Sequence, residues 1–235
     1  MRFKDVFSII GPAMVGPSSS HTAGAARIGR VGRQLFGHMP KSVEVTFYGS
    51  FAATYQGHGT DRAIIGGLLD FTTDDQRLPQ SLSLAAEAGM EVTFRSGTGL
   101  FPHPNTVKLR LYGDEPEEKL TLIGVSIGGG NIEIVDIDGF SVKLTGTYPT
   151  ILIRHMDWLG VLANVTEVIR KWEVNIGHMS LDRKQRSGEA LTVLELDAAA
   201  EHLLLHDLGD LPAVHAVTEI NLDAGPQHKG ERSQL

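Results

Sequence analysis

The order of strand-like and helix-like segments in the last third of the chain constrains the fold most. After a break at 146–149, the pattern of apolar residues indicates a strand, a helix, two strands, a short helix and a strand, over 150–154, 157–172, 174–183, 189–197, 198–208 and 213–222. The order βαββαβ builds a four-stranded sheet with both helices on one face, a ferredoxin-like fold of roughly 75 residues.

The segment before this unit mixes the same two patterns without a simple order. Residues 21–36 place small and apolar residues at helical spacing, and we expect Arg27, Arg30 and Arg33 to form a solvated helix face. Alternation predicts strands at 43–49 and 106–112, and further antiparallel strands over 119–144, with a glycine bend at 128–130. The sequence therefore predicts an α+β domain over 1–147, a second domain over 148–222, and a disordered tail over 223–235.

Composition excludes several classes of function. The 235 residues include 41% hydrophobic residues, enough for a core, and carry a net charge of −7, which disfavours nucleic acid or an anionic membrane as a partner. No apolar run approaches the roughly 20 residues of a spanning helix, so we expect a cytoplasmic protein. With no cysteine there is no disulfide, thiol nucleophile or thiolate-bound metal. The ten histidines form no HExxH-like pair, and we expect no metal site in this chain.

Three polar motifs, each containing a histidine, interrupt the first domain. The first motif is GPSSSHT at 16–22, the second is GHGTD at 57–61, and the third is HPNT at 103–106. Taken singly, each has a structural explanation: a helix N-cap, a turn followed by an aspartate cap, and a bend fixed by proline. Their joint presence favours a shared polar site.

Together the three motifs resemble those of the iron–sulfur-dependent L-serine dehydratases, in the beta subunit of the two-chain form. The first domain is also similar to the allosteric substrate-binding domain of phosphoglycerate dehydrogenases. Residues 148–222 resemble an ACT domain, a regulatory fold that binds small ligands, with His155, Asp157 and Asn175 placed as in the phosphoglycerate dehydrogenase type. Leu159 departs from that pattern, because the ACT loop usually has proline before its glycine.

The resemblance implies a reaction and a set of partners. The reaction is the deamination of L-serine to pyruvate and ammonia, a step of amino-acid degradation that feeds gluconeogenesis. The alpha subunit would supply the cysteines for a 4Fe-4S cluster, whose iron acts as a Lewis acid on the departing hydroxyl. We expect this chain to dimerise and to form a heterotetramer with alpha. L-Serine is the expected substrate and a candidate ligand of the ACT domain.

The same resemblance suggests roles for individual residues. Hydroxyls and backbone N–H groups at a helix N-terminus suit a carboxylate, so the first motif is interpreted as a carboxylate cradle. A neutral histidine can act as a base near neutral pH, and His58 between two glycines is the first candidate, with His21 orienting the substrate. The predicted substrate-binding residues are Ser18, Ser19, Ser20, Thr22, Gly59, Thr60, Asp61, His103 and Asn105. The predicted effector-binding residues, at a domain–domain interface, are His155, Asp157 and Asn175; the alternative is that this domain only mediates dimerisation.

An alternative function is a binding module without catalytic groups. In that case the chain would sense small molecules and amino acids, as the regulatory parts of phosphoglycerate dehydrogenases do. Such a module is not expected to need three histidine-bearing motifs, and their presence favours the catalytic interpretation. The fold alone cannot separate the two.

Overall fold

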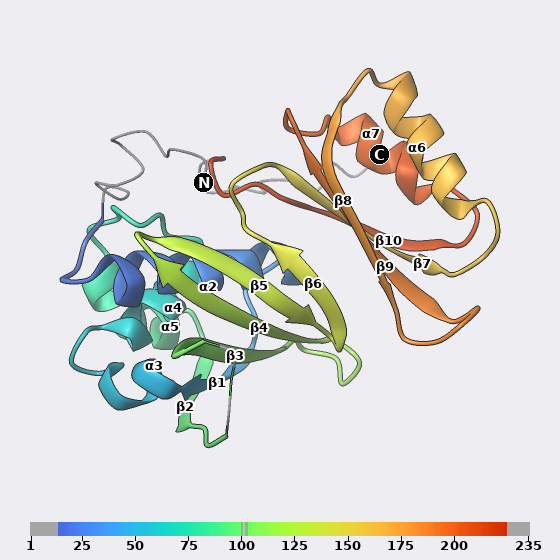
Figure 1. Ribbon diagram of the computed structural model, residues 1–235. Helices are drawn as coiled ribbons and strands as arrows, with labels where there is room; N and C mark the ends of the chain where they lie inside the picture. The colour runs from blue at the N-terminus through green and yellow to red at the C-terminus, as the bar shows by residue number, and fades with distance from the viewer. Residues whose placement is uncertain (1–13, 100, 102, 225–235) are drawn as a thin grey trace.

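A six-stranded sheet forms the first domain in the computed structural model, which describes residues 14–99, 101 and 103–224 (Figure 1). The strands lie in the order β2-β1-β3-β4-β5-β6, with β1 and β2 parallel and the other neighbours antiparallel. Their bounds are Ser42–Tyr48 (β1), Glu91–Ser96 (β2), Asn105–Tyr112 (β3), Lys119–Gly128 (β4), Asn131–Ile137 (β5) and Phe140–Leu144 (β6). The alternation that predicted β1 is confirmed, because Val43, Val45 and Phe47 are buried.

Helices cover one face of this sheet (Figure 1). They are η1 (Ser19–Ala23), α2 (Gly24–Phe36), α3 (Gly49–Thr54), α4 (Thr60–Leu68), η2 (Leu78–Gln80) and α5 (Ser81–Glu87). The helices α2 and α4 pack on the strands through Ile28, Ile64 and Leu68, which share one core cluster with Leu109 and Leu122 of the sheet. Because η1 runs directly into α2, the first motif stands at the start of the central helix.

The helices α2 and α4 cross in close contact because glycines face each other at the crossing. A Cβ on Gly29 would lie 2.2 Å from the carbonyl oxygen of Ile64, and a Cβ on Gly67 would lie 2.1 Å from that of Ala26. No side chain fits at these distances. The crossing therefore fixes the relative position of the two helices that begin at the first and second motifs.

The Gly67→Ala variant is expected to be less stable by about 1–3 kcal/mol, because the added methyl overpacks this crossing. Gly209→Ala is the matched control, since a Cβ there would meet nothing within 4 Å. Thermal unfolding followed by circular dichroism measures both. A Gly67→Ala protein that melts with the wild type would contradict the tight crossing.

The second domain has the predicted βαββαβ order. Its elements are β7 (Thr150–Met156), α6 (Val161–Lys171), β8 (Ile176–Arg183), β9 (Glu189–Leu196), α7 (His202–Gly209) and β10 (Val214–Ile220). The sheet order is β10-β7-β9-β8, with every neighbouring pair antiparallel, which confirms the ferredoxin-like fold. Ile151, Ile153 and Leu194 face α6 and α7.

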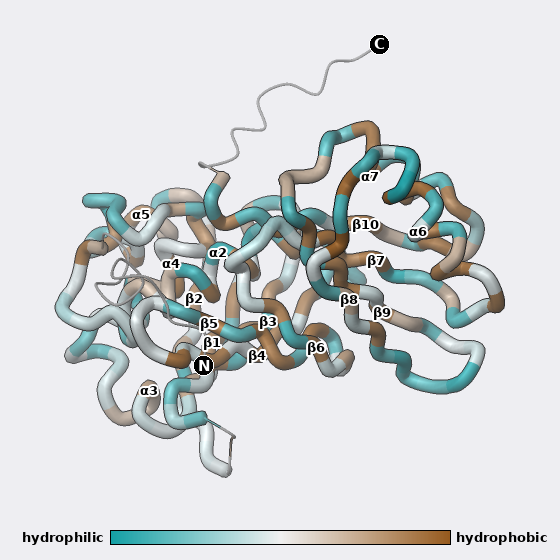
Figure 2. Tube along the Cα trace, turned by 45° about the horizontal axis from the view of Figure 1, so that its top comes forward, coloured by the Kyte–Doolittle hydropathy of each residue, from teal (hydrophilic) through white to brown (hydrophobic). Residues whose placement is uncertain are grey.

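The opposite face of the second sheet packs on the first domain. Leu152, Leu191, Val193 and Ile220 are buried in the same cluster as the first core. Hydrophobic residues accordingly recur along the strands of both sheets, whereas hydrophilic residues gather in the outer loops (Figure 2). Within the described residues, no helix is long and apolar enough to cross a membrane.

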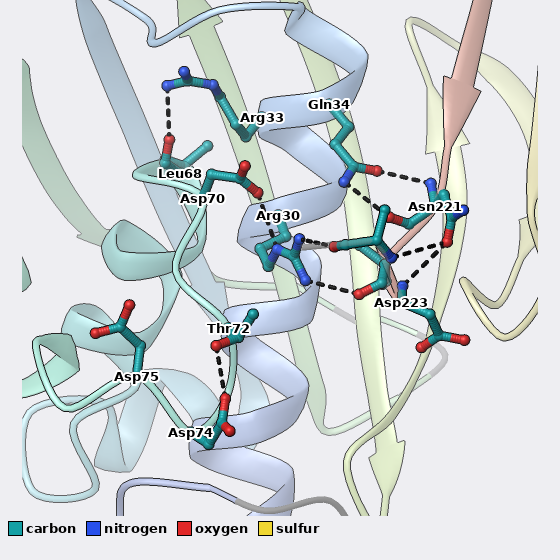
Figure 3. Close-up of polar contacts among 12 residues, drawn as sticks. Arg30, Arg33, Gln34, Leu68, Asp70, Thr72, Asp74, Asp75, Asn221 and Asp223 are labelled. Carbon is teal, nitrogen blue, oxygen red and sulfur yellow. Dashed lines mark hydrogen bonds and ion pairs between the residues drawn. The ribbon is translucent and has the colours of Figure 1, made fainter. Parts of the chain in front are cut away.

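A polar network on α2 joins the two domains (Figure 3). Arg30 is only 3% exposed; it bonds Asp70 Oδ1 at 3.0 Å and donates to the carbonyl oxygens of Leu222 at 2.8 Å and Ala224 at 3.0 Å. Gln34 exchanges two hydrogen bonds with the backbone of Asn221. The expectation of a solvated arginine face was therefore wrong for Arg30, because the second domain covers this side of α2.

The start and end of the second domain both meet α2. Arg27 donates to the carbonyl oxygen of Gly146, just before β7, at 3.0 Å. After β10, the backbone N–H groups of Asp223 and Ala224 both donate to the side chain of Asn221. Residues 225–235, the remainder of the tail predicted to be disordered, lie outside the described residues.

Candidate active site

The serine run of the first motif begins the helical segment and surrounds His21. Ser18 is the extended N-cap residue of η1, and its hydroxyl accepts from the backbone N–H of His21 at 3.3 Å. The Nδ1 atom of the His21 ring lies 3.0 Å from Ser20 Oγ and 3.4 Å from Ser18 Oγ. Thr22 is buried and Ser19 is half-buried in the same turn. The hydroxyls of Ser18 and Ser20 are thus gathered around one edge of an imidazole.

The second motif places His58 against His21. Their ring centroids are 4.8 Å apart, and the hydroxyl of Thr22 donates to the carbonyl oxygen of His58 at 3.4 Å. The Nδ1 atom of His58 is buried and has no hydrogen-bond partner among the described residues. Gly59 has a φ of 68°, the left-handed conformation that favours glycine, and α4 begins immediately after it. The two predicted catalytic histidines are therefore neighbours.

Two further residues of the second motif are buried at the start of α4. Thr60 is fully buried, and its hydroxyl has no partner among the described residues. Asp61 accepts from the backbone N–H of Arg62 at 2.8 Å, and burial raises the pKa of its carboxyl. Polar atoms left without partners at a helix N-terminus are what a polar ligand would satisfy.

The third motif reaches His21 through residues that sequence reasoning did not single out. The carbonyl oxygen of Pro104 accepts from the backbone N–H of Ser50 at 2.7 Å, and the hydroxyl of Ser50 lies 3.4 Å from His21 Nε2. Within the motif, the backbone N–H of Asn105 donates to His103 Nδ1 at 3.1 Å. The signal that could have indicated Ser50 is its place in the first turn of α3, directly after β1.

His21 is packed so that its neutral form is favoured. Its ring meets Phe51 edge-on at 5.2 Å and His58 on another side. Partial burial is the main cause that lowers the pKa of His21 from its ordinary value of 6.5, and a charge on His58 lowers it further. At neutral pH this imidazole can therefore accept a proton.

The lowered pKa of His21 makes stability depend on pH. Below pH 6.5 the unfolded chain binds a proton that folded His21 resists, so the free energy of unfolding falls as the pH drops through 6.5 toward the folded pKa. Above pH 6.5 the contribution of His21 to the free energy of unfolding no longer changes with pH. Urea unfolding on both sides of pH 6.5 should show a shallower decline for His21→Gln than for the wild type. If the free energy of unfolding fell with pH equally steeply in both proteins, the pKa of His21 would not be lowered by folding.

A cavity of about 200 Å³ opens beside His58. It lies between the first and second motifs, and its lining includes Gly16, Thr22, Gly57, His58 and Arg62. Ser18 and Ser20 face His21 rather than this cavity. A second, larger cleft of about 430 Å³, lined by residues such as Lys143 and Glu195, lies at the junction of the domains and contains none of the motif residues. The smaller cavity is the one that His58 lines.

This chain offers no site for a metal cluster in the part that the structure describes. No group of three or more histidine, cysteine, aspartate or glutamate side chains could hold a metal ion there. The whole sequence contains no cysteine. Thiolate ligands for an iron–sulfur cluster would therefore have to come from another chain.

The three predicted effector-binding residues of the second domain do not meet within one chain. His155 and Asp157 stand at the end of β7, whereas Asn175 precedes β8. The strands β7 and β8 are both antiparallel to β9 and hence run in the same direction, so these positions lie at opposite ends of the sheet. Asn175 instead donates to Asp197 at 2.6 Å. The effector site expected at a domain–domain interface therefore stays a prediction.

His155 and Asp157 already have partners. His155 is 2% exposed; its Nδ1 donates to the carbonyl oxygen of Met156, and its Nε2 lies 2.8 Å from the hydroxyl of Thr192. Asp157 pairs with Arg183 at 2.7 Å, and this hydrogen bond is the main cause that lowers the pKa of the Asp157 carboxyl. His155 is therefore a satisfied core residue, and Asp157 is the more accessible of the two.

Comparison with known proteins places the chain in a family. Residues 3–87 match the family described as serine dehydratase beta chain. The chain is 49% identical over 220 residues to a probable L-serine dehydratase beta chain of Bacillus subtilis, an alignment that covers 94% of this chain and 99% of the relative. It is 40% identical over 192 residues to the L-serine dehydratase beta chain of Peptoniphilus asaccharolyticus, covering 81% of this chain and 86% of that protein.

A more distant likeness involves a different enzyme. D-3-phosphoglycerate dehydrogenase of Bacillus subtilis is 24% identical over 199 residues, which cover 84% of this chain and 37% of the dehydrogenase. This likeness agrees with the predicted α+β fold and its ACT domain. The extent and identity of the first two matches show that the chain belongs to the family of L-serine dehydratase beta chains.

Proposed function

We propose that this chain is the beta subunit of an L-serine ammonia-lyase and contributes substrate-binding and proton-transfer groups to an active site completed by an alpha subunit. The observation that carries the proposal is the pairing of His21 and His58. Their rings lie 4.8 Å apart where α2 and α4 begin, beside a small cavity and a cluster of hydroxyls. The reaction is loss of water from L-serine, followed by hydrolysis of the resulting enamine or imine, which takes up one water and releases pyruvate and ammonia.

The chain's own residues would divide binding from proton transfer. The start of η1 and α2 presents hydroxyls, N–H groups and the positive end of a helix dipole, a suitable environment for the substrate carboxylate. His58 is the proposed base that takes the proton from the α-carbon. Its buried Nδ1 has no partner within the part of the chain that the structure describes, and a polar group of the substrate or the partner would remove the cost of leaving it unbonded. His21 would orient the substrate, with His103 and Asn105 nearest its ammonium group.

The 4Fe-4S cluster is proposed to belong to the alpha subunit. When bound there, its iron would supply a Lewis acid for the substrate hydroxyl. The absence of cysteine from this chain supports a division in which one subunit supplies thiolates and the other supplies hydroxyls and imidazoles. The cytoplasmic location predicted from the sequence stays a prediction.

Regulation would require a second copy of the chain. The strand β8 forms an edge of the second sheet, and Met179 and Leu181 on it are 42% and 39% exposed. Antiparallel pairing of two such edges would bring Asn175 of one copy toward the end of the sheet that carries Asp157 in the other. We propose that this homodimer, within a heterotetramer, is the form in which the ACT domain binds L-serine or another amino acid.

The function is tested by anaerobic assay of the chain assembled with a cluster-loaded alpha subunit. The expected result is formation of pyruvate and ammonia in equal amounts from L-serine, with D-serine as the control that gives neither. A complex that contains both chains and an intact cluster but releases no pyruvate from L-serine would overturn the proposal.

A further inference from the structure

Ser50 stands between the first and third motifs, outside both. We propose that Ser50 is a positioning residue: its hydroxyl holds the imidazole of His21 in one orientation. The effect of Ser50 on catalysis rests on the proposed function. The contact between Ser50 and His21 is a property of this chain alone. The carrying observation is that Ser50 Oγ lies 3.4 Å from His21 Nε2, on the ring edge opposite to Ser20.

The backbone around Ser50 is fixed by the third motif. The N–H of Ser50 donates to the carbonyl oxygen of Pro104 at 2.7 Å, and Gly49 forms an isolated bridge with Asn105. Gly49 has a φ of 57°, and a Cβ there would lie 2.5 Å from the same carbonyl oxygen. Only glycine allows this approach, which presents the Ser50 side chain to His21.

The other ring contacts of His21 constrain its ring plane but not the direction in which its nitrogens point. Phe51 and His58 pack on the ring, and neither contact involves a particular nitrogen. The nitrogens are held by their hydroxyl neighbours, Ser20 at Nδ1 and Ser50 at Nε2. A hydroxyl can donate or accept, so either tautomer of neutral His21 keeps both contacts. The two hydroxyls therefore fix the orientation of the ring, and Ser50 holds its Nε2 side.

The Ser50 hydroxyl has no competing structural task. The helix α3 begins without a side-chain cap, since its N-cap residue is Tyr48. Among the described residues, the Ser50 hydroxyl forms its hydrogen bond with His21. Removing it would therefore affect the ring of His21 rather than the start of α3.

The test is the hydrogen bonding of His21 Nε2 in the full chain, read from its ¹⁵N resonance in long-range ¹H–¹⁵N correlation spectra near neutral pH. Ser50→Ala is expected to displace the Nε2 resonance from its wild-type position. Ser83→Ala is the matched control and should leave it in place, because Ser83 is an exposed helical serine bonded to a backbone carbonyl. If Ser50→Ala misfolds by circular dichroism, Ser50→Cys replaces it. An unchanged Nε2 resonance in the folded variant would overturn the proposal.

Kinetics of the assembled enzyme supply the second readout. Misplacement of a catalytic group can cost about 100-fold in rate, so kcat of Ser50→Ala should fall by roughly 10- to 100-fold, with a much smaller change in KM. Ser50→Thr keeps the hydroxyl and should recover most of the loss. A kcat unchanged by Ser50→Ala would overturn the positioning role. An inactive wild-type assembly would count against the proposed function alone, since the spectra are recorded without turnover.

Discussion

Replacement of His58 by alanine is expected to lower kcat of the assembled enzyme by about 10²- to 10⁴-fold, the usual contribution of a general base. The reason is that His58 lies beside the cavity, packs its imidazole against His21, and has a ring nitrogen without a hydrogen-bond partner among the described residues. Pyruvate formation under anaerobic conditions gives kcat and KM. KM should change much less, since the hydroxyls and the helix N-terminus that bind the carboxylate remain.

Two controls make the His58 result interpretable. His202→Ala removes an exposed histidine at the start of α7 and should leave turnover unchanged. Iron content and the cluster absorption of the His58→Ala complex should equal those of the wild type. Near-normal turnover with an intact cluster would remove His58 from the role of base and leave His21 as the candidate.

Replacement of Arg30 by methionine is expected to lower the free energy of unfolding by about 3–5 kcal/mol, the cost of removing one partner of a buried ion pair. The variant keeps an apolar stem of similar length but loses the donors that serve Asp70, Leu222 and Ala224. Urea unfolding, followed by circular dichroism and by fluorescence, measures the loss. These contacts join α2 to the end of the second domain. The urea midpoints reported by circular dichroism and by fluorescence should therefore differ more in the variant than in the wild type.

The matched control for Arg30 is a surface pair. Arg170→Met removes an exposed partner of Glu167 within α6 and should change stability by no more than about 0.5 kcal/mol. An Arg30→Met protein as stable as the Arg170→Met protein would contradict the view that a buried polar network holds the domains together.

Local patterns in the sequence predicted the elements that carry the site. Alternation indicated β1 and β3, helical spacing indicated α2, and the order of segments predicted the second sheet with both helices on one face. These predictions succeed because residues two or four apart share one face of a strand or helix, whatever packs on that face. The meeting of the first and second motifs follows from the crossing of α2 and α4.

The features that sequence reasoning missed depend on contacts between distant segments. The strand β2 lies parallel to β1 after a crossover through α4 and α5, and no pattern within 91–96 reveals that pairing. Arg30 has the helical position of a solvated residue, but the end of β10 covers it. Ser50 is a single serine after a strand, and only the fold shows that it reaches His21.

The predicted effector-binding residues are separated within one chain for a geometric reason that the predicted fold already contained. In a βαββαβ sheet the first and second strands run in the same direction, so the end of one and the start of the other cannot meet in a single chain. Asp157 and Asn175 could share a ligand only across two copies.

The most direct test of the account is a comparison of three anaerobic preparations: this chain alone, the cluster-loaded alpha subunit alone, and their mixture. The account predicts pyruvate formation from L-serine only in the mixture, because the hydroxyls and histidines lie in one chain and the thiolates in the other. Full activity of the alpha subunit alone would contradict it. No activity in a mixture with an intact cluster would also contradict it and would favour the alternative, a binding module without catalytic groups.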